Sequence, residues 1–290
     1  MAKSKIVVTG GSGNLGRCTV QTLLDAGYEV LNLDVVPPRE RICESWVADL
    51  SQTGDLYEAC KGADTVIHLA AHQAPFMAAD AEVFRNNMAT TYNVFKVASD
   101  MGVRRVVHAS SVAAYGFTYA PEMWNPEYLP LDEEHPLNPK DPYSFSKVFG
   151  EQIADSYVGM FDISVVSLRL AGVNFDLTYE SLPERWAEPG ARLGTFWSYV
   201  DVRDAAVSCK LAIEADITGH EAFNIAAKNS RFQTPTTELA EKYLPGTKVM
   251  YGVEGCWSGL KTAKARDMLG YTDKHVWENY IRPDGTLISK

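Results

Sequence analysis

The 290-residue sequence predicts an α/β fold, with a doubly wound parallel β-sheet and a smaller, less regular region toward the C-terminus. Over the first 170 residues, short apolar runs alternate with amphipathic stretches, as expected when helices cover both faces of a parallel sheet. A glycine-rich turn follows the first apolar run directly. Beyond Arg169 the alternation stops, which indicates where the regular part of the fold ends.

Six short runs have the composition of strands and are expected to form the sheet. They lie at residues 5–9, 29–34, 45–47, 65–69, 105–109 and 163–168. Between them, apolar residues recur at helical spacing, which predicts helices at residues 15–26, 80–101 and 143–159. Right-handed crossovers through these helices would order the strands into one parallel sheet.

The second half of the chain has fewer regular elements. Residues 172–197 include three glycines, two prolines and two tryptophans without a clear period, and long irregular segments of this kind usually serve function or move. A helix is expected at residues 205–214, with the Asp204 carboxylate as its N-cap. A further strand at 222–225 and a short helix at 235–242 follow.

Charge and composition exclude several classes of partner. The chain has 37 acidic and 27 basic residues, a net charge of −10, and such a surface repels the phosphate backbone of nucleic acids. No run approaches the ~18 consecutive apolar residues of a membrane span, and residues 1–4 do not open a signal peptide. The five cysteines never form a CxxC pair, which is typical of free thiols in a reducing compartment. We therefore expect a cytoplasmic protein without nucleic-acid or membrane partners.

Residues 9–16 read TGGSGNLG between the first expected strand and the first expected helix. Glycines allow a tight turn there, and backbone N–H groups at the helix N-terminus can then bind a pyrophosphate. Asp34 ends the second strand, where a carboxylate accepts hydrogen bonds from an adenosine ribose and repels a 2′-phosphate. A tight turn alone would also explain the glycines, but together with Asp34 they predict a Rossmann-type domain that binds NAD in preference to NADP.

Tyr143 and Lys147 are four residues apart and face the same side of an expected helix. A free tyrosine, with a pKa of about 10, is a weak base at neutral pH, and a nearby ammonium would lower that pKa. Ser111 follows the strand at 105–109 and could hold the same substrate oxygen. After a dinucleotide-binding motif, these three side chains indicate an acid/base site for hydride transfer.

The chain resembles the extended short-chain dehydrogenases/reductases of the NAD-dependent epimerase/dehydratase family over nearly its whole length. The matching residues are TGGSGNLG at 9–16, Asp34, ADL at 48–50, HLAA at 68–71, Asn87, Thr91, Asn93, SS at 110–111, YG at 115–116, Tyr143, Lys147, Arg169 and VRD at 202–204. Residues 192–204 and the short chain are most similar to the uronate dehydrogenase branch of that family.

The resemblance implies roles for the matching positions. Ser111, Tyr143 and Lys147 would be catalytic, and no metal is expected. The NAD site would comprise Gly10, Gly13, Asn14, Leu15, Gly16, Asp34, Asp49, Leu50, Leu69, Ala70, Ala71, Asn87, Ser110, Tyr143 and Lys147. The substrate would contact His72, Ser111, Val112, Ala113, Tyr143, Arg169, Gly172 and Trp197. A homodimer would form through the helices at 80–101 and 143–159.

For some of these residues the sequence leaves two roles open. His72 could instead be a structural, hydrogen-bonding histidine. The arginines at 169, 185 and 192 could bind an anion, or could be solvated or ion-paired. The loop at 117–130, which carries Tyr119, could form a wall of the substrate pocket or simply pack.

Departures from the family's patterns narrow the reaction. Dehydratases place Thr-Asp-Glu at residues 111–113, where this chain has Ser-Val-Ala and no acid to expel a hydroxyl. Nucleotide-sugar epimerases place an asparagine at Gly172, and at Trp197 an arginine that contacts the diphosphate. Uronate dehydrogenases have Asn-His at residues 112–113, where this chain has Val-Ala, which argues against uronate itself.

The sequence therefore predicts an NAD-dependent oxidoreductase that moves a hydride between NAD and a free sugar, polyol or similar small hydroxy or keto compound, with Tyr143 as acid/base. An NAD-retaining epimerase of sugars or nucleotide sugars is the alternative. NAD binding without turnover is a third hypothesis, which the complete set of Ser111, Tyr143 and Lys147 disfavours. Residues 1–170 would form the NAD-binding domain, completed by about 200–228, and residues 171–199 and 229–290 the substrate-binding region.

Overall fold

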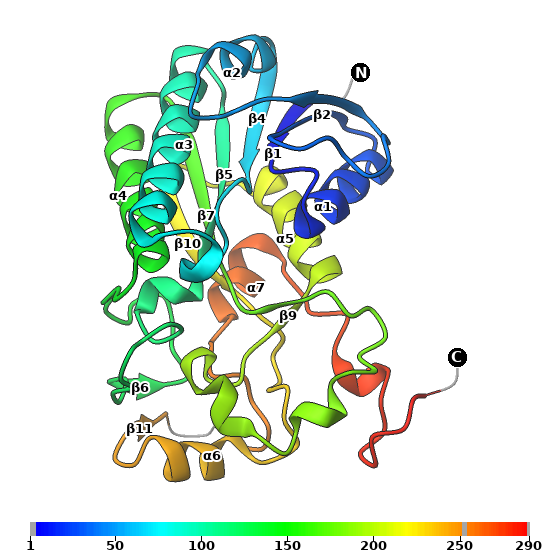
Figure 1. The fold of residues 1–290 in the computed structure, drawn as a ribbon, viewed down its shortest axis with the longest axis vertical. Helices are drawn as coiled ribbons and strands as arrows, with labels where there is room; N and C mark the ends of the chain where they lie inside the picture. Colours follow the sequence, from blue (N-terminus) through cyan, green and yellow to red (C-terminus); the bar gives the residue numbers. More distant parts are fainter. Residues whose placement is uncertain (1–3, 251–253, 289–290) are drawn as a thin grey trace.

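A computed structural model of the chain describes residues 4–250 and 254–288. Residues 1–3, which belong to the predicted NAD-binding domain and to the N-terminal segment 1–4, lie outside the described residues. So do residues 251–253 and 289–290 of the predicted substrate-binding region. Figure 1 shows a central sheet with helices on both faces and a lower part built of short helices and loops. The sheet has seven parallel strands in the order β10-β7-β5-β4-β1-β2-β3, which confirms the predicted doubly wound fold. The strands are β1 Lys5–Thr9, β2 Glu29–Asp34, β3 Glu44–Val47, β4 Ala63–His68, β5 Arg105–Ser111, β7 Ser164–Leu170 and β10 His220–Ile225.

The helices form one layer on each face of the sheet. On one face α1 (Asn14–Asp25) packs beside α5 (Val202–Glu214), and on the other α3 (Asp80–Asp100) packs beside α4 (Pro142–Met160), with α2 (Gly54–Ala59) next to α3 (Figure 1). Each layer has its own apolar core. Because successive strand side chains point to opposite faces and both faces are covered, the strands other than the edge strand β3 are largely buried on both sides.

Two short helices and several strand ends differ from the predictions. The helices α2 and α7 (Ala263–Leu269) were not predicted, because six and seven residues are too few to show a helical period. Strand β5 runs to Ser111, two residues further than expected, because it pairs with β7 as far as Leu170. The serine pair at 110–111 therefore forms the last two residues of this strand.

The N-cap predicted for the helix at 205–214 was wrong. Helix α5 begins at Val202, and its N-cap is Asp201, whose carboxylate accepts a hydrogen bond from the Arg203 N–H at 2.9 Å. Asp204 lies inside the first turn and accepts from the His275 N–H at 2.8 Å. Two aspartates three residues apart are equivalent as cap signals, and the end of strand β9 at Asp201 determines which one caps the helix.

The lower part contains only short elements, as its irregular sequence predicted. Strand β8 pairs with β9, and β6 with β11, in two small parallel sheets. The elements are η1 Pro75–Met77, η2 Val112–Tyr115, β6 Tyr128–Leu129, β8 Val173–Asn174, η3 Pro183–Arg185, η4 Pro189–Thr195, β9 Val200–Asp201, α6 Thr236–Tyr243, β11 Lys248–Val249 and η5 Trp277–Asn279. Within the described ranges, the helices are too short or too polar to span a membrane.

Candidate active site

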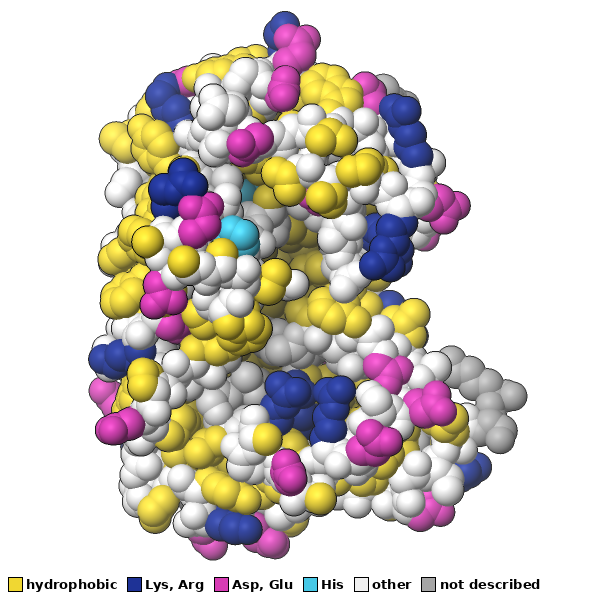
Figure 2. Space-filling model, viewed as in Figure 1, with side chains coloured by type: hydrophobic (Ala, Val, Ile, Leu, Met, Phe, Trp, Pro, Cys, Tyr) yellow, Lys and Arg dark blue, Asp and Glu magenta, His cyan; other side chains and the backbone are white. Residues whose placement is uncertain are grey.

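A cavity of about 710 Å³ opens at the carboxyl ends of the central strands. Its walls include residues that follow β1, β2 and β4, and the last residues of β5. Figure 2 shows a hollow on this face of the molecule. Strands β2 and β4 lie on opposite sides of β1, so the strand order reverses there, and ligands of doubly wound sheets bind at such a reversal.

The glycine-rich turn at the base of the cavity requires its glycines. Gly10 has a φ of +73°, and a Cβ on it would lie 2.6 Å from the backbone nitrogen of Ala70. A Cβ on Gly16 would lie 2.1 Å from the carbonyl oxygen of Gly10. Helix α1 begins directly after Gly13 without a side-chain cap, and its first residues line the cavity. The backbone N–H groups of this helix N-terminus therefore fit a pyrophosphate.

Asp34 lies at the end of β2 and lines the cavity. Its carboxylate accepts hydrogen bonds from the N–H groups of Ser12, at 2.9 Å, and Val36, at 3.3 Å. These contacts hold the side chain beside the glycine-rich turn and leave carboxylate lone pairs available, an arrangement that fits a ribose diol. Val35 and Val36 also line the cavity, although sequence reasoning did not select them. Their position directly after Asp34 was the available signal.

Tyr143, Lys147 and Ser111 line the same cavity. Asp141 caps α4 by accepting a hydrogen bond from the Ser144 N–H at 2.9 Å, which fixes the first turn, where Tyr143 lies. The Lys147 Nζ donates a hydrogen bond to the Ala109 carbonyl at 2.7 Å and lies 5.4 Å from the centre of the Tyr143 ring. Strand β5 thus brings the Ser111 hydroxyl to Tyr143 and Lys147, which lie more than 30 residues later on helix α4.

Burial is the largest cause of the pKa shifts of Tyr143 and Lys147. It raises the pKa of Tyr143 above its ordinary value, and the Ser111 hydroxyl opposes that shift as a hydrogen-bond partner. Burial also lowers the pKa of Lys147 to about 8, although Glu151 acts to raise it. Sequence reasoning expected the ammonium to lower the pKa of Tyr143. The structure differs, because the tyrosine is buried and the ammonium donates to the Ala109 carbonyl.

Asn87 joins the cavity wall to α4 and does not itself line the cavity. Its Oδ1 accepts a hydrogen bond from the His72 N–H at 2.8 Å, and its Nδ2 donates to the His72 carbonyl at 2.9 Å and to the Ser146 hydroxyl at 3.2 Å. His72 lines the cavity. His68 does not, and it bonds Thr9 and Thr91 in the core, where burial lowers its pKa to about 3 and keeps it neutral.

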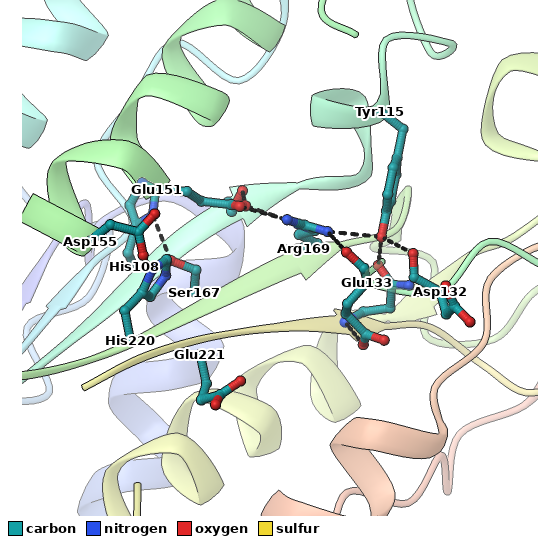
Figure 3. A network of polar contacts seen from close by, with 12 residues as sticks. His108, Tyr115, Asp132, Glu133, Glu151, Asp155, Ser167, Arg169, His220 and Glu221 are labelled. Carbon is teal, nitrogen blue, oxygen red and sulfur yellow. Dashed lines mark hydrogen bonds and ion pairs between the residues drawn. The ribbon is translucent and has the colours of Figure 1, made fainter. Parts of the chain in front are cut away.

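Arg169 lies outside the cavity wall, contrary to its predicted place as a substrate contact. Its guanidinium forms a buried, bidentate ion pair with Glu151, with Nη2–Oε2 at 2.7 Å and Nε–Oε1 at 3.0 Å (Figure 3). It also donates to the Tyr115 hydroxyl and the Glu133 carbonyl, each at 3.1 Å. Glu151 in turn accepts a hydrogen bond from the Ser110 hydroxyl, at 2.5 Å. The Arg169–Glu151 ion pair therefore contacts the cavity wall through Ser110, without lining the cavity itself.

Trp197 and Ala113 also lie outside the cavity wall, and both were predicted as substrate contacts. The Trp197 side chain is fully buried, and its indole N–H donates to the Pro189 carbonyl at 3.1 Å. Ala113 is buried in the turn after Ser111, to whose hydroxyl its backbone N–H donates. The other predicted substrate residues line the cavity: His72, Ser111, Val112, Tyr143 and Gly172. So do the predicted cofactor residues Gly10, Gly13, Asn14, Leu15, Gly16, Asp34, Asp49, Leu50, Leu69, Ala70, Ala71, Ser110, Tyr143 and Lys147.

Two loop segments close the far end of the cavity, next to Tyr143. They meet where a Cβ on Gly194 would lie 2.6 Å from the Phe117 carbonyl oxygen. Tyr119 and Arg192, for which the sequence left a role in the pocket open, line the cavity here. The other lining residues at this end, which were not predicted as substrate contacts, are Gln73, Phe76, Thr118, Val173, Phe175, Ala191, Gly194 and Thr195. Within the described part of 229–290, no residue lines the cavity. The contacts of these loops come from distant segments, so periodicity could not reveal them.

Comparison with known proteins places the chain in a family. The model of the NAD-dependent epimerase/dehydratase family matches residues 6–174. The L-arabinose 1-dehydrogenase (NAD(P)(+)) of Haloferax volcanii is 33% identical over 64% of this chain and 72% of that protein. The NAD-dependent glucose-6-phosphate dehydrogenase of the same organism is 29% identical over 78% and 87%. A UDP-glucose 4-epimerase of Corynebacterium glutamicum is 25% identical over 94% and 92%.

Solved structures show the same fold. A short-chain dehydrogenase/reductase from Agrobacterium tumefaciens with bound NAD has a TM-score of 0.72 at 24% identity, covering 94% of each chain. A uronate dehydrogenase also has this fold, with a TM-score of 0.69 at 23% identity, covering 95% of this chain and 83% of that one. In this chain the glycine turn, Asp34, Ser111, Tyr143 and Lys147 line one cavity. The chain belongs to the NAD-dependent epimerase/dehydratase family of extended short-chain dehydrogenases/reductases, enzymes whose cofactor is NAD.

Proposed function

We propose that this enzyme oxidises a free sugar, polyol or similar small hydroxy compound and releases the reduced cofactor after each turnover. The observation that carries the proposal is the position of Trp197. Nucleotide-sugar epimerases have a diphosphate-binding arginine there, whereas this side chain is buried and bonded to the Pro189 carbonyl. The similarity to an arabinose dehydrogenase and a glucose-6-phosphate dehydrogenase supports the same conclusion.

In the proposed reaction, Tyr143 takes the proton from the substrate hydroxyl and Ser111 holds that oxygen. When bound, NAD supplies the acceptor for the hydride that leaves the same carbon, so the substrate becomes a carbonyl compound. Because burial raises the pKa of Tyr143, its phenolate is strongly basic once formed. A hydrogen bond from the Ser111 hydroxyl would stabilise it. The apolar walls at Phe76 and Tyr119 would limit the access of water.

An epimerase that retains NAD is the second candidate. It is favoured by one observation, the similarity to a UDP-glucose 4-epimerase over nearly the whole length of both chains. An NADH-absorbance screen at 340 nm separates the two candidates. Wild-type enzyme with NAD is expected to form NADH continuously with a free sugar, sugar acid, sugar phosphate or polyol. Conversion of a UDP-sugar to its epimer without net NADH would instead support the epimerase.

We also propose that the protein is a cytoplasmic homodimer that assembles through α3 and α4. Exposed aromatic side chains on these helices support this surface, with Phe84 36%, Tyr92 49% and Phe145 38% exposed. The five cysteines are all free thiols, which supports a reducing compartment. Sedimentation velocity would show a dimer, and substituting Phe84 and Tyr92 by glutamate would shift it toward monomer.

Asp34 is expected to make NAD the better cofactor by at least ~10-fold in kcat/KM, which corresponds to about 1.4 kcal/mol. The reason is repulsion between its carboxylate and a 2′-phosphate in a position beside the glycine turn. Asp34→Ala should lower the ratio of kcat/KM for NAD to kcat/KM for NADP, chiefly because kcat/KM for NADP rises. Asp64→Ala, on the exposed pair with Arg104 away from the cavity, is the control and should leave the ratio unchanged. Equal use of both cofactors by the wild type would refute the role of Asp34.

The affinity for NAD is expected to fall as the pH rises through about 8. Lys147 has a pKa of about 8, so its ammonium is present below that pH and is lost above it. If the ammonium holds the nicotinamide ribose, the Kd for NAD should rise by up to ~10-fold per pH unit above pH 8. Fluorescence titration between pH 6.5 and 9.5 would measure it. Lys147→Met should bind NAD weakly at every pH and lose this dependence. A wild-type Kd that stays constant over this range would contradict the role.

A further inference from the structure

Three arginines gather below the substrate end of the cavity, and we call them the arginine cluster: Arg185, Arg192 and Arg231. Arg192 lines the cavity, and Arg185 and Arg231 line a second, small cavity of about 10 Å³. None of the three forms an ion pair within the described residues. Figure 2 shows Lys and Arg side chains gathered along the lower edge of the hollow. Unpaired positive charge is therefore concentrated here in a protein with a net charge of −10.

Arg231 is the unusual member of the cluster, because its side chain is buried. The residue is only 8% exposed, and its guanidinium donates one hydrogen bond, from Nη2 to the Ser198 carbonyl at 2.7 Å. Its Nε is buried without a hydrogen-bond partner, and the guanidinium lies 5.7 Å from the centre of the Tyr199 ring. Burial, together with the positive charges of Arg192 and Arg185, lowers the pKa of Arg231 to about 9. A buried charge without a counter-charge is costly, so a ligand that supplies one is favoured.

Gly172 lies between this buried guanidinium and the main cavity. It lines the main cavity, and a Cβ placed on it would lie 3.2 Å from the Arg231 Nη2. Among the described residues, no other neighbouring heavy atom lies within 4 Å of that point. A side chain at residue 172 would fill the space beside Nη2, and glycine leaves that space free for an anionic group that approaches from the cavity.

We propose that the substrate carries a carboxylate or phosphate group, which binds at the arginine cluster with Arg231 and Arg192 as its direct partners. The inference rests on the proposed function and names the substrate class within it. Charge-assisted hydrogen bonds from a planar guanidinium to a carboxylate or phosphate are among the stronger polar contacts in proteins. Arg185, at the exposed side of the small cavity, adds positive charge to the site.

Matched substrates test the proposal. NADH formation at 340 nm is compared for a neutral sugar, the corresponding sugar acid and the corresponding sugar phosphate, so the two anions are distinguished. The kcat/KM for one of the anionic compounds is expected to exceed that for the neutral sugar by roughly 10- to 100-fold. Oxidation of the neutral sugar with equal or greater efficiency would overturn this inference and leave the proposed function standing.

Variants test the residues. Arg231→Met and Arg192→Met are each expected to raise the KM for the anionic substrate by about 10-fold or more, and the preference in kcat/KM for the anionic over the neutral sugar should fall by a similar factor. Arg266→Met removes the same charge from an exposed side chain on α7, away from the cavity, and should change neither value. Arg192 is exposed, so its variant tests the proposal even if Arg231→Met does not fold. Unchanged KM values in the folded variants would overturn the assignment.

A binding measurement does not depend on turnover. Inorganic phosphate is expected to bind the NAD-loaded wild type in calorimetry, and the binding should be lost in Arg192→Met. If no free compound yields NADH but phosphate binds in this way, the proposed function fails and the anion site remains. If turnover occurs and phosphate binds equally to wild type and variant, the anion site fails. A UDP-sugar used in preference to every free sugar anion would overturn both.

Discussion

Replacing Tyr143 with phenylalanine is expected to lower kcat by at least ~100-fold while the affinity for NAD stays nearly unchanged. The substitution removes only the phenolic oxygen and keeps the ring, which packs edge-on against Tyr119 at 5.9 Å between ring centres. General acid–base groups typically contribute 10²–10⁴-fold to the rate, so their loss is large even where binding is intact. Steady-state rates at 340 nm and fluorescence titration with NAD would measure the two effects separately.

Tyr119→Phe is the matched control for this variant. It removes a hydroxyl from the same wall of the cavity, next to the same ring, and is expected to change kcat by no more than a few-fold. A Tyr143→Phe enzyme that keeps more than half of the wild-type kcat would remove Tyr143 from the mechanism. An equal loss in both variants would show that the wall is sensitive to any lost hydroxyl.

Arg169→Met is expected to lower the free energy of unfolding by about 3–5 kcal/mol, because it leaves Glu151 buried without its partner. The pair is bidentate, and both side chains are only 6% exposed. Urea unfolding followed by circular dichroism would measure the loss. The KM for substrate in the folded fraction should change little, since Arg169 does not line the cavity.

Two further variants separate burial from charge in this experiment. Arg104→Met breaks an exposed pair with Asp64, with a side chain 52% exposed, and is expected to cost no more than about 1 kcal/mol. The double variant Arg169→Met/Glu151→Leu removes both buried charges and should recover much of the loss. A large rise in KM with unchanged stability in Arg169→Met would instead return Arg169 to the substrate site.

The sequence predicted the sheet and most of the residues that line the cavity at the strand ends, because these depend on local patterns. The turn at 9–16 and Asp34 each belong to a strand end, and strand ends could be read from short apolar runs. Tyr143 and Lys147 share one helix, so their spacing alone placed them on one face. The parallel sheet then brings these strand ends to one edge, where the cavity opens.

The substrate end was predicted less well, because it is built from loops whose contacts are distant in the sequence. Arg169 was expected to contact substrate, but Glu151 on α4 holds it in the core. Trp197 was expected at the cavity, but the turn at η4 directs its indole to the Pro189 carbonyl. Arg231 was not predicted as a site residue, because only the fold brings it next to Gly172, which is 59 residues earlier in the sequence. Neither periodicity nor residue spacing carries information of this kind.

The fate of NADH tests the central claim most directly. Enzyme loaded with NAD is mixed with an excess of the free substrate found in the absorbance screen, and the solution is passed through a membrane that retains the protein. The account predicts NADH in the filtrate, more than one equivalent per enzyme and in step with the substrate oxidised. NADH that forms up to one equivalent, stays with the protein and disappears as an epimer of the substrate accumulates would contradict it.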